Sequence, residues 1–215
     1  MKTITTIITA LILLTSCNDL NQNRSDKKIK LDSTETKTDS KPEKEKTKVP
    51  ETVYFDYSNS TFTSDYTDST THIFSNSETK DNFKIYVPKG LVTETTSFLL
   101  ITNSFGDTIH LETFPTSELI YGYKLEEIKS DSEVIKHIKD RISSNLDKSS
   151  FIDIRTTDLS LITDSEPDDF EDHETFLYCK QNDVPIYVLR LGNENSTFYG
   201  YSNSERKAVP IIYCC

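Results

Sequence analysis

A change in composition near Pro50 limits what this chain can fold into. Residues 18–50 consist almost entirely of Lys, Asp, Glu, Ser, Thr and Asn, with few apolar side chains. A stretch of this kind cannot bury enough apolar surface to offset the entropy that ordering removes. We therefore expect residues 18–50 to be a disordered tether, and residues 51–215 to form one globular domain with room for a real core.

Within this domain, apolar patterns predict antiparallel strands. Residues 83–87 alternate between apolar and polar types and end at Pro88. Residues 98–101 are apolar throughout, which predicts an interior strand covered on both faces. The loop 103–107 has the length and the glycine of a hairpin connection, so residues 108–112 should form the returning strand.

The returning strand carries a histidine and a carboxylate two residues apart. Strict alternation places Ile109 and Leu111 on the core face, so His110 and Glu112 should share the solvent face. The spacing His-x-Glu also occurs in zinc deaminases, but the Pro-Cys-x-x-Cys that accompanies it there is missing from this sequence. We interpret His110 and Glu112 as a polar patch on the sheet surface.

Two segments have helical patterns. Apolar residues recur along one stripe of residues 134–142, and Ser130 with Glu133 has the spacing of a capping box. A second helix is expected over residues 167–180, because a proline followed by acidic residues favours a helix N-terminus.

Further strands complete the predicted fold. The expected strands of the C-terminal part are 151–162, 186–191, 197–201 and 209–213. Pro210 should confine the last of these to an edge or a bulge. Residues 51–80 should be irregular apart from a short edge strand at 72–75. The predicted fold class is α+β, a mainly antiparallel sheet packed against one or two helices.

The N-terminus has the layout of a secretory signal. Lys2 is followed by an apolar run, residues 4–14, that is too short to be a transmembrane helix. The run ends in Leu14-Thr15-Ser16-Cys17, which resembles the lipobox of bacterial lipoprotein precursors. In that family the cysteine thiol carries a diacylglycerol, the peptide is cut just before the cysteine, and the new amine is usually acylated too.

This resemblance implies a membrane anchor. Residues 1–16 would be removed, and acyl chains such as palmitate on Cys17 would hold residues 17–50 and the domain at the bacterial cell envelope. Asn18 and Asp19 occupy positions that influence sorting between membranes in some bacteria, and the outer membrane is slightly favoured. The alternative is a secreted protein in which Cys17 follows the cleavage site by chance.

The domain is also similar to a loose family of small envelope lipoproteins. The shared features are Phe98-Leu99-Leu100-Ile101 with Gly106-Asp107, an acidic helix followed by tyrosine-rich strands, and the terminus Ile212-Tyr213-Cys214-Cys215. The resemblance implies the architecture and carries no activity with it.

The charge of the domain restricts its partners. The chain has a net charge of −11, and because Lys2 and residues 18–50 together contribute +3, residues 51–215 carry −14. Such a field repels nucleic acid and attracts cationic surfaces. We expect no nucleic-acid partner, and a basic protein is the expected kind of charged partner.

The densest acidic run lies between residues 164 and 174. Its spacing partly matches a calcium loop, but Asp169 stands where that loop needs glycine and Thr175 where it needs a bidentate acid. We predict a charged helix start that can contact a partner, with a weak divalent-cation site as the lesser alternative. The predicted contact carboxylates are Asp164, Glu166, Asp168, Asp169, Glu171, Asp172 and Glu174.

Three cysteines and two tyrosines complete the candidate residues. Cys179 is predicted to form a disulfide with Cys214 or Cys215, and the alternative is three reduced, structural thiols. Tyr199 and Tyr201 share one face of a predicted strand, where they form either a contact surface or part of the core.

The sequence contains no catalytic signature. Gly-x-Ser-x-Gly, Lys-Thr-Gly, His-Glu-x-x-His and glycine-rich phosphate loops are all missing, and the four histidines show no metal spacing. We predict no enzymatic activity, cofactor or metal. The expected function is binding or scaffolding in the envelope. The alternatives are an acidic inhibitor or immunity protein that neutralises a basic envelope-directed toxin or hydrolase, and a hydrolase whose site is assembled from distant residues.

Overall fold

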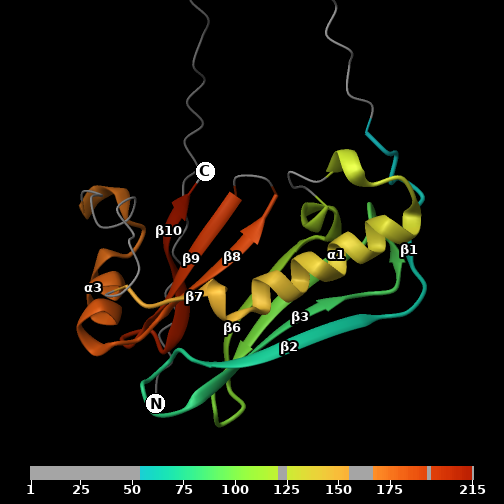
Figure 1. Ribbon diagram of the computed structural model, residues 1–215. Coiled ribbons are helices and arrows are strands. Elements are labelled where there is room, and N and C mark those ends of the chain that lie inside the picture. Colours follow the sequence, from blue (N-terminus) through green and yellow to red (C-terminus); the bar gives the residue numbers. More distant parts are fainter. Residues whose placement is uncertain (1–53, 121–124, 155–166, 193–194, 215) are drawn as a thin grey trace, which may run out of the picture. The chain divides into compact units, whose positions relative to one another are not determined.

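The strands form two four-stranded antiparallel sheets in the computed structural model, which describes residues 54–120, 125–154, 167–192 and 195–214 (Figure 1). These ranges belong to one compact unit, Val49–Cys215. They contain two α-helices and ten strands, including one short two-stranded pair. The predicted α+β fold class is confirmed. The predicted tether lies outside the described residues.

The first sheet has the strand order β2-β3-β5-β6. Its strands are β2 (Tyr66–Ile73), β3 (Lys80–Val87), β5 (Thr96–Thr102) and β6 (Thr108–Pro115), and β1 (Thr61–Phe62) pairs separately with β4 (Gly90–Leu91). The β5–β6 hairpin and the interior position of β5 confirm the predictions. The short edge strand predicted at 72–75 is wrong in extent, because β2 pairs with β3 over all eight of its residues.

The second sheet has the strand order β10-β9-β8-β7. Its strands are β7 (Phe151–Ile152), β8 (Ile186–Leu191), β9 (Asn195–Ser202) and β10 (Lys207–Cys214). β10 is an edge strand whose register shifts after Pro210, as predicted. The strand predicted at 151–162 is only two residues long where it is described, and residues 155–162 lie outside the described part.

Helix α1 (Asp131–Leu146) completes the edge of the second sheet beyond the end of β7. The Asn145 side chain accepts a hydrogen bond from the backbone N–H of Arg190 at 2.8 Å and donates one to its carbonyl oxygen at 3.1 Å. The side-chain amide of Asn145 thus makes the two hydrogen bonds that one residue of a neighbouring strand would make. The predicted cap is confirmed, because the backbone N–H of Glu133 donates to the Ser130 hydroxyl.

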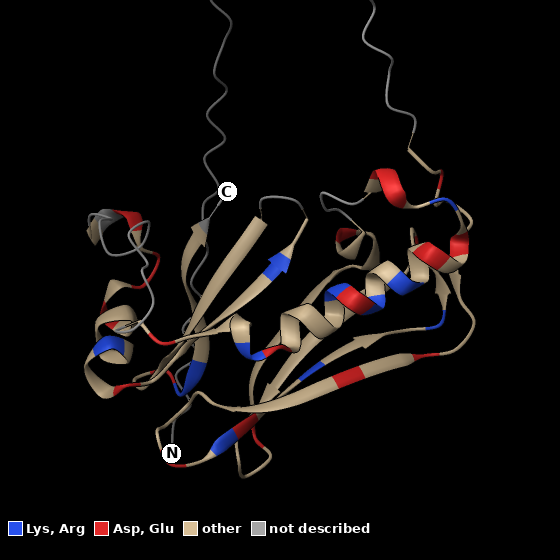
Figure 2. Cartoon of the chain, in the orientation of Figure 1, with Lys and Arg blue, Asp and Glu red and all other residues tan. Residues whose placement is uncertain are grey.

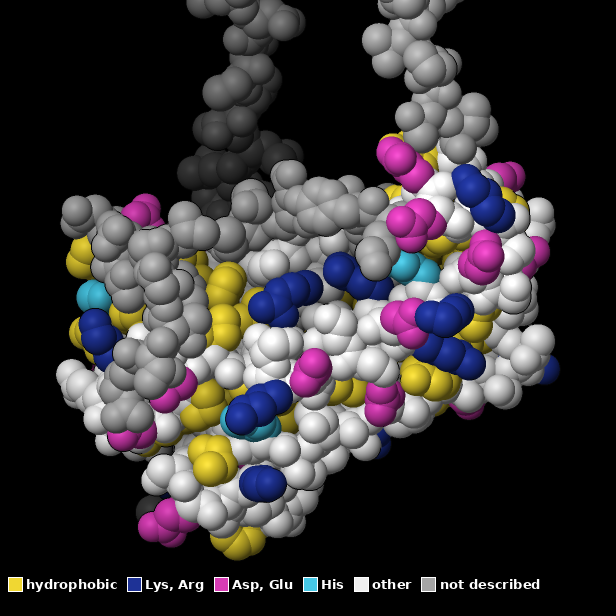
Figure 3. Space-filling model, in the orientation of Figure 1, with side chains coloured by type: hydrophobic (Ala, Val, Ile, Leu, Met, Phe, Trp, Pro, Cys, Tyr) yellow, Lys and Arg dark blue, Asp and Glu magenta, His cyan; other side chains and the backbone are white. Residues whose placement is uncertain are grey.

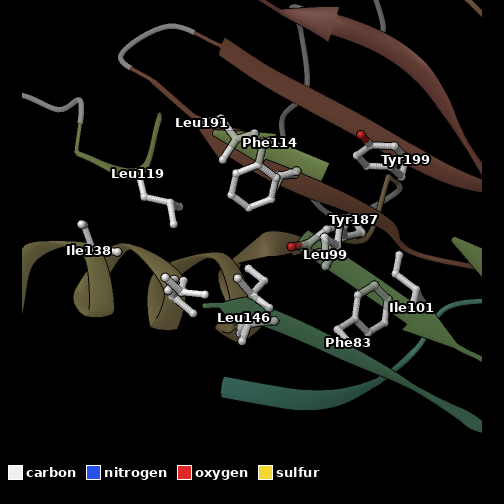
Figure 4. Close-up of a cluster of buried hydrophobic side chains, with 14 of the residues drawn as sticks. Phe83, Leu99, Ile101, Phe114, Leu119, Ile138, Leu146, Tyr187, Leu191 and Tyr199 are labelled. Carbon is white, nitrogen blue, oxygen red and sulfur yellow. The ribbon is translucent and has the colours of Figure 1, made fainter. Parts of the chain in front are cut away.

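The main core lies where α1 and the inner faces of both sheets meet (Figure 4). Phe83 of β3 is fully buried, with its ring 4.7 Å from that of Phe151 and 4.9 Å from that of Tyr187. Ile138 and Leu146 reach the same cluster from α1. Because aromatic and aliphatic side chains from three layers interdigitate here, this cluster is the main source of stability.

A second core cluster lies between the second sheet and α3 (His173–Asn182). Phe176 and Cys179 of α3 pack against Ile186 and Ile211 of the sheet. The second sheet is therefore covered on both faces, by α3 on one and by the main core on the other. The remaining described elements are the 3₁₀ turns η1 (Thr116–Leu119), η2 (Leu125–Glu127), η3 (Lys148–Ser150) and η4 (Pro167–Asp169).

Candidate functional site

Strand β6 lies where the edges of the two sheets meet. β6 is the last strand of the first sheet, and β10 is the last strand of the second. His110 of β6 reaches across, with its Nδ1 atom 3.3 Å from the carbonyl oxygen of Ala208 in β10. One face of β6 therefore borders the junction between the sheets, and the other faces outward.

A β-bulge decides which side chains of β6 point to which side. Ile101 pairs with His110, whereas the next residue of β5, Thr102, pairs with Thr108. Ile109 is thus the extra residue, and it is buried together with the inward-facing His110. An inserted residue of this kind inverts the alternation of every side chain that follows it.

The inversion corrects the assignment made from the sequence. His110 and Glu112 were expected on the solvent face, but their side chains turn inward and are only 14% and 28% exposed. Leu111 was expected in the core, but it turns outward and is 60% exposed. Neither the apolar periodicity nor the composition of this segment indicates a bulge, and strict alternation therefore assigns Leu111 and Glu112 to the wrong faces.

Glu112 is the centre of an inter-sheet polar cluster, which consists of His110, Glu112 and Tyr199. The hydroxyl of Tyr199 in β9 donates a hydrogen bond to Glu112 Oε2, and His110 Nε2 lies 3.4 Å from the same oxygen. The rings of His110 and Tyr199 have their centroids 4.6 Å apart. The cluster joins β6 to β9 and β10 through side chains.

Burial and hydrogen bonding set the protonation of this cluster. Burial alone raises the pKa of Glu112, but hydrogen bonds from His110 and Tyr199 outweigh it and leave the pKa below the ordinary value of 4.5. Burial and the hydrogen bond to Glu112 both raise the pKa of Tyr199. At neutral pH the carboxylate is therefore ionised and the phenol is neutral.

An open groove of about 270 Å³ runs beside the cluster. It is lined by Thr108, Ile109, His110, Leu111, Lys207 and Ala208. Both ring nitrogens of His110 face oxygen atoms, Nδ1 the carbonyl oxygen of Ala208 and Nε2 the Oε2 atom of Glu112. Within the described ranges, no group of three or more His, Cys, Asp or Glu residues is placed to hold a metal ion.

Replacing Glu112 with Gln is expected to lower the free energy of unfolding at neutral pH by about 1 kcal/mol, because an acceptor remains but its charge is lost. Since the folded-state pKa of Glu112 lies below 4.5, its contribution is present above that pH and is lost as the pH falls through the folded-state value. Urea unfolding of the full chain between neutral and acidic pH should show a steeper loss of stability in the wild type than in Glu112→Gln.

The exposed Glu94 provides the matched control for this experiment. Glu94→Gln removes the same charge from a side chain outside the cluster and should follow the wild-type profile. Identical acid dependence of the wild type and Glu112→Gln would show that Glu112 does not contribute to the pH dependence.

The outward side of β6 belongs to what we call the outer face, the solvent side of the first sheet. It contains the cross-strand pairs Tyr86–Phe98 on the two interior strands and Leu100–Leu111 between β5 and the edge strand β6. The rings of Tyr86 and Phe98 stack with centroids 4.9 Å apart. Phe98 and Leu100 are only half-buried, so the prediction that both faces of this strand are covered is wrong. Both described helices pack elsewhere, α1 on the inner face and α3 on the second sheet.

The outer face differs in charge from the domain as a whole. Its strand positions carry Lys80 and Lys84, no Asp or Glu, and a surround of threonine and serine side chains. Asp65 is at the margin, just before β2, where it accepts a hydrogen bond from the Tyr86 hydroxyl. A neutral to basic, partly apolar surface therefore exists on a domain with a strongly negative net charge.

The predicted acidic contact residues differ in whether the structure describes them and in how exposed they are. Asp164 and Glu166 lie outside the described residues, as does the side chain of Asp168. The side chains of Asp169, Glu171 and Glu174 are exposed, as a contact surface requires. Acidic side chains are scattered over the face of the molecule in Figure 3 rather than gathered there.

Asp172 has a structural role in this run. Its carboxylate accepts hydrogen bonds from the backbone N–H and the hydroxyl of Thr175, at 2.8 and 2.7 Å, and so caps α3. The prediction that this helix begins at Pro167 is wrong, because η4 is a separate turn and the N–H of Glu171 donates to the Ile211 carbonyl of β10. That tie to the sheet sets where the helix can start.

The predicted disulfide from Cys179 is wrong, because Cys179 is a free thiol that is 1% exposed. Its Sγ packs above Gly200, and Gly200 pairs with Val209 of β10. Cys214 lies five residues farther along β10, roughly 16 Å at the rise of a strand, whereas a disulfide joins Cα atoms at most about 7 Å apart. Burial raises the pKa of the thiol to about 11. Cys215 lies outside the described residues.

Tyr199 and Tyr201 share one face of β9, as predicted, and that face is turned to the core. Tyr199 is 3% exposed and hydrogen-bonded to Glu112, so the contact-surface alternative is wrong for this residue. Tyr201 is half-buried and packs edge-on against Phe74, with ring centroids 6.5 Å apart. The core alternative considered from the sequence is the one that the structure bears out.

Comparisons with known proteins found no similar protein. The chain matches no protein-family model, no curated protein and no solved structure. Cys17 lies outside the described residues. None of the helices within the described ranges is long and apolar enough to cross a membrane.

Proposed function

We propose that this chain is a lipid-anchored, non-enzymatic protein of the bacterial cell envelope that binds a protein partner through the outer face of its first sheet. The lipid would be carried by Cys17 in the lipobox-like sequence. The observation that supports binding is the outer face itself, where stacked rings and an exposed Leu111 lie on a surface without strand carboxylates. Exposed apolar patches of this kind mark interaction sites in soluble domains.

The charge of the outer face favours a partner other than a second copy. Four strands about 4.8 Å apart and three rows of side chains about 7 Å apart give a surface of roughly 400 Å². Any partner confined to this face would bury about 800 Å² in total, which is the size of a weak, transient interface. In a pair of identical copies, Lys80 and Lys84 would repel their counterparts. A different protein with apolar surface and carboxylates opposite these lysines fits better.

The test is photo-cross-linking in the cells that produce the protein. A photo-reactive phenylalanine analogue in place of Leu111 is expected to give one discrete adduct, because this side chain is the most exposed apolar one of the outer face and lies beside Leu100. The additional change Phe98→Ala should reduce that adduct at least about tenfold, since it removes one ring of the stacked pair. Cys17→Ser should abolish metabolic labelling with palmitate and release the protein from membranes.

Leu177 of α3 is the matched control, because it is also an exposed leucine but lies beside Glu174 and away from the outer face. An adduct with a basic protein at Leu177, and none at Leu111, would contradict the proposal and favour the acidic inhibitor. Labelling that persists in Cys17→Ser would contradict the lipid anchor independently of the binding surface.

A further inference from the structure

The loop between β5 and β6 presents a phenylalanine ring to solvent. Phe105 is 89% exposed, the largest exposed fraction among the exposed large hydrophobic side chains of the described residues. Figure 1 shows this loop protruding from the end of the first sheet, where the chain turns into β6. The ring is left out of the core, so its burial against a partner would release hydrophobic free energy that folding does not use.

Asn103 holds this loop in one conformation. Its side-chain oxygen accepts hydrogen bonds from the backbone N–H groups of Phe105 and Asp107, at 3.0 and 2.9 Å, and its side-chain nitrogen donates to the Asp107 carboxylate at 3.1 Å. Gly106, with a φ of +90°, supplies the left-handed backbone that the turn requires. Because the backbone beside the ring is already ordered, binding through Phe105 would cost little conformational entropy.

Two further turns lie close to this loop. The turn before β3 is tied to it by Asp81, a fully buried carboxylate that accepts hydrogen bonds from the backbone N–H and hydroxyl of Ser75 and from the backbone of Ser104. The turn before β10 is also near, because Thr108 and Lys207 line the same groove. Three connections, residues 74–79, 103–107 and 203–206, therefore gather at one end of the fold.

The exposed charges of this end balance one another. Figure 2 shows residues of both signs there. An anionic membrane surface attracts segments with an excess of basic residues, and a single ring without such an excess is a poor membrane anchor. A protein surface therefore fits Phe105 better than a lipid surface does. The exposed charged residues of the three connections and their flanks are Glu78, Lys80, Asp107, Glu205, Arg206 and Lys207.

A second copy of the chain is a poor match for this ring. The described residues form an apolar pocket lined by Phe55, Ile120, Leu125 and Val134, among others. Its volume is about 30 Å³, whereas a cavity that takes a benzene ring has roughly 150 Å³. This pocket is too small to receive Phe105 of another copy.

We propose that Phe105 anchors a second protein contact, in which its ring enters an apolar pocket of a partner other than this chain. Aromatic anchors surrounded by groups that exclude water carry most of the binding free energy in protein interfaces. Ser104, Asn203 and Ser204 are exposed on the connections beside the ring and supply such a polar surround. This contact goes beyond the proposed function, because the loop lies past the ends of the strands that form the outer face.

The test is photo-cross-linking of the full-length protein in the cells that produce it, with a photo-reactive side chain in place of the exposed Ser104. We expect one discrete adduct with a different protein, reduced at least about tenfold by Phe105→Ala and retained in Phe105→Leu. Tyr213→Ala is the matched control, because Tyr213 is an exposed aromatic residue of β10 outside the loop. Phe105→Ala should fold like the wild type, since the ring is outside the core.

A second measurement reports directly on burial of the ring. The protein recovered in the adduct is purified and added to the full-length chain carrying 4-fluorophenylalanine at position 105. We expect a saturable shift of the fluorine resonance, because the ring moves from water into an apolar pocket. A label at Phe98 instead reports on the outer face, so the proposed function and this contact are tested separately.

Several results would overturn the inference. They are the lack of an adduct, an adduct that Phe105→Ala leaves unchanged, equal losses in Phe105→Ala and Tyr213→Ala, an adduct between two copies, or a fluorine resonance that does not move. Vesicles of phosphatidylglycerol provide the remaining arm. Binding of the Cys17→Ser protein to these vesicles, lost on adding Phe105→Ala, would assign the ring to a membrane surface and overturn the protein contact.

Discussion

Replacing Phe83 with alanine is expected to lower the free energy of unfolding by about 3–5 kcal/mol, the range for deleting a fully buried phenylalanine ring. Phe83 has no exposed surface and contacts the rings of Phe74, Phe151 and Tyr187, with centroid distances of 5.3, 4.7 and 4.9 Å. Phe83 belongs to the first sheet and its partners Phe151 and Tyr187 to the second, so the cavity cannot close without moving one sheet against the other. Urea unfolding of the full chain, followed by far-ultraviolet circular dichroism, measures the effect.

Phe98 provides the control for this prediction. It is the same residue type on the adjacent strand β5, but it lies on the outer face and is only half-buried. Phe98→Ala should cost about 1–2 kcal/mol, since part of the ring is already in water. Equal losses in the two variants would mean that the outer face is covered like a core, which would also remove the basis of the proposed binding surface.

Replacing Gly200 with valine is expected to lower the free energy of unfolding by about 3 kcal/mol, the upper part of the range for overpacking. A Cβ atom on Gly200 would lie 2.8 Å from Thr175 Cγ2, 3.2 Å from Cys179 Sγ and 3.2 Å from Ile211 Cγ2. The first two neighbours belong to α3 and the third to β10, so the helix must lift from the sheet. The same denaturation assay measures this loss.

Thr175→Ser tests whether the cost of the Gly200 variant arises from this contact. Serine keeps the hydroxyl that donates to Asp172 and removes the methyl group that a new side chain would meet first. Adding Thr175→Ser to Gly200→Val should recover about 1 kcal/mol, whereas Thr175→Ser alone should not stabilise the protein. Additive effects of the two changes would show that α3 is not held by the close approach at Gly200.

The sequence predicted most of the regular elements because their signals are local. The stripe of α1 and its Ser130 cap, the β5–β6 hairpin, and the edge position of β10 with Pro210 follow from spacing and residue type within a few neighbours. The length of β2 was underestimated because threonine, serine and aspartate dominate its sequence. Only its pairing with β3 makes it an eight-residue strand.

The orientations and contacts of the candidate site residues were mostly not predicted, because they depend on residues that are distant in the sequence. One extra residue, Ile109, turned Leu111 outward and Glu112 inward. The contact between Arg141 and Arg190 joins residues 49 positions apart, and neither has a motif around it. Cys179 is free because it packs above the Gly200–Val209 pair, and only the strand register reveals how far along β10 Cys214 lies.

The sequence by itself determined the fold class, the net charge and the order of the main elements, because each depends on composition or on contacts between near neighbours. Only the tertiary structure decided which face of β6 meets the second sheet, where α3 begins, and that Arg141 of α1 donates to the backbone of Arg190 in β8. These outcomes depend on a bulge, on a backbone bond from Glu171 to Ile211, and on packing between α1 and β8. All three arise from the way distant segments pack together, and sequence spacing does not record them.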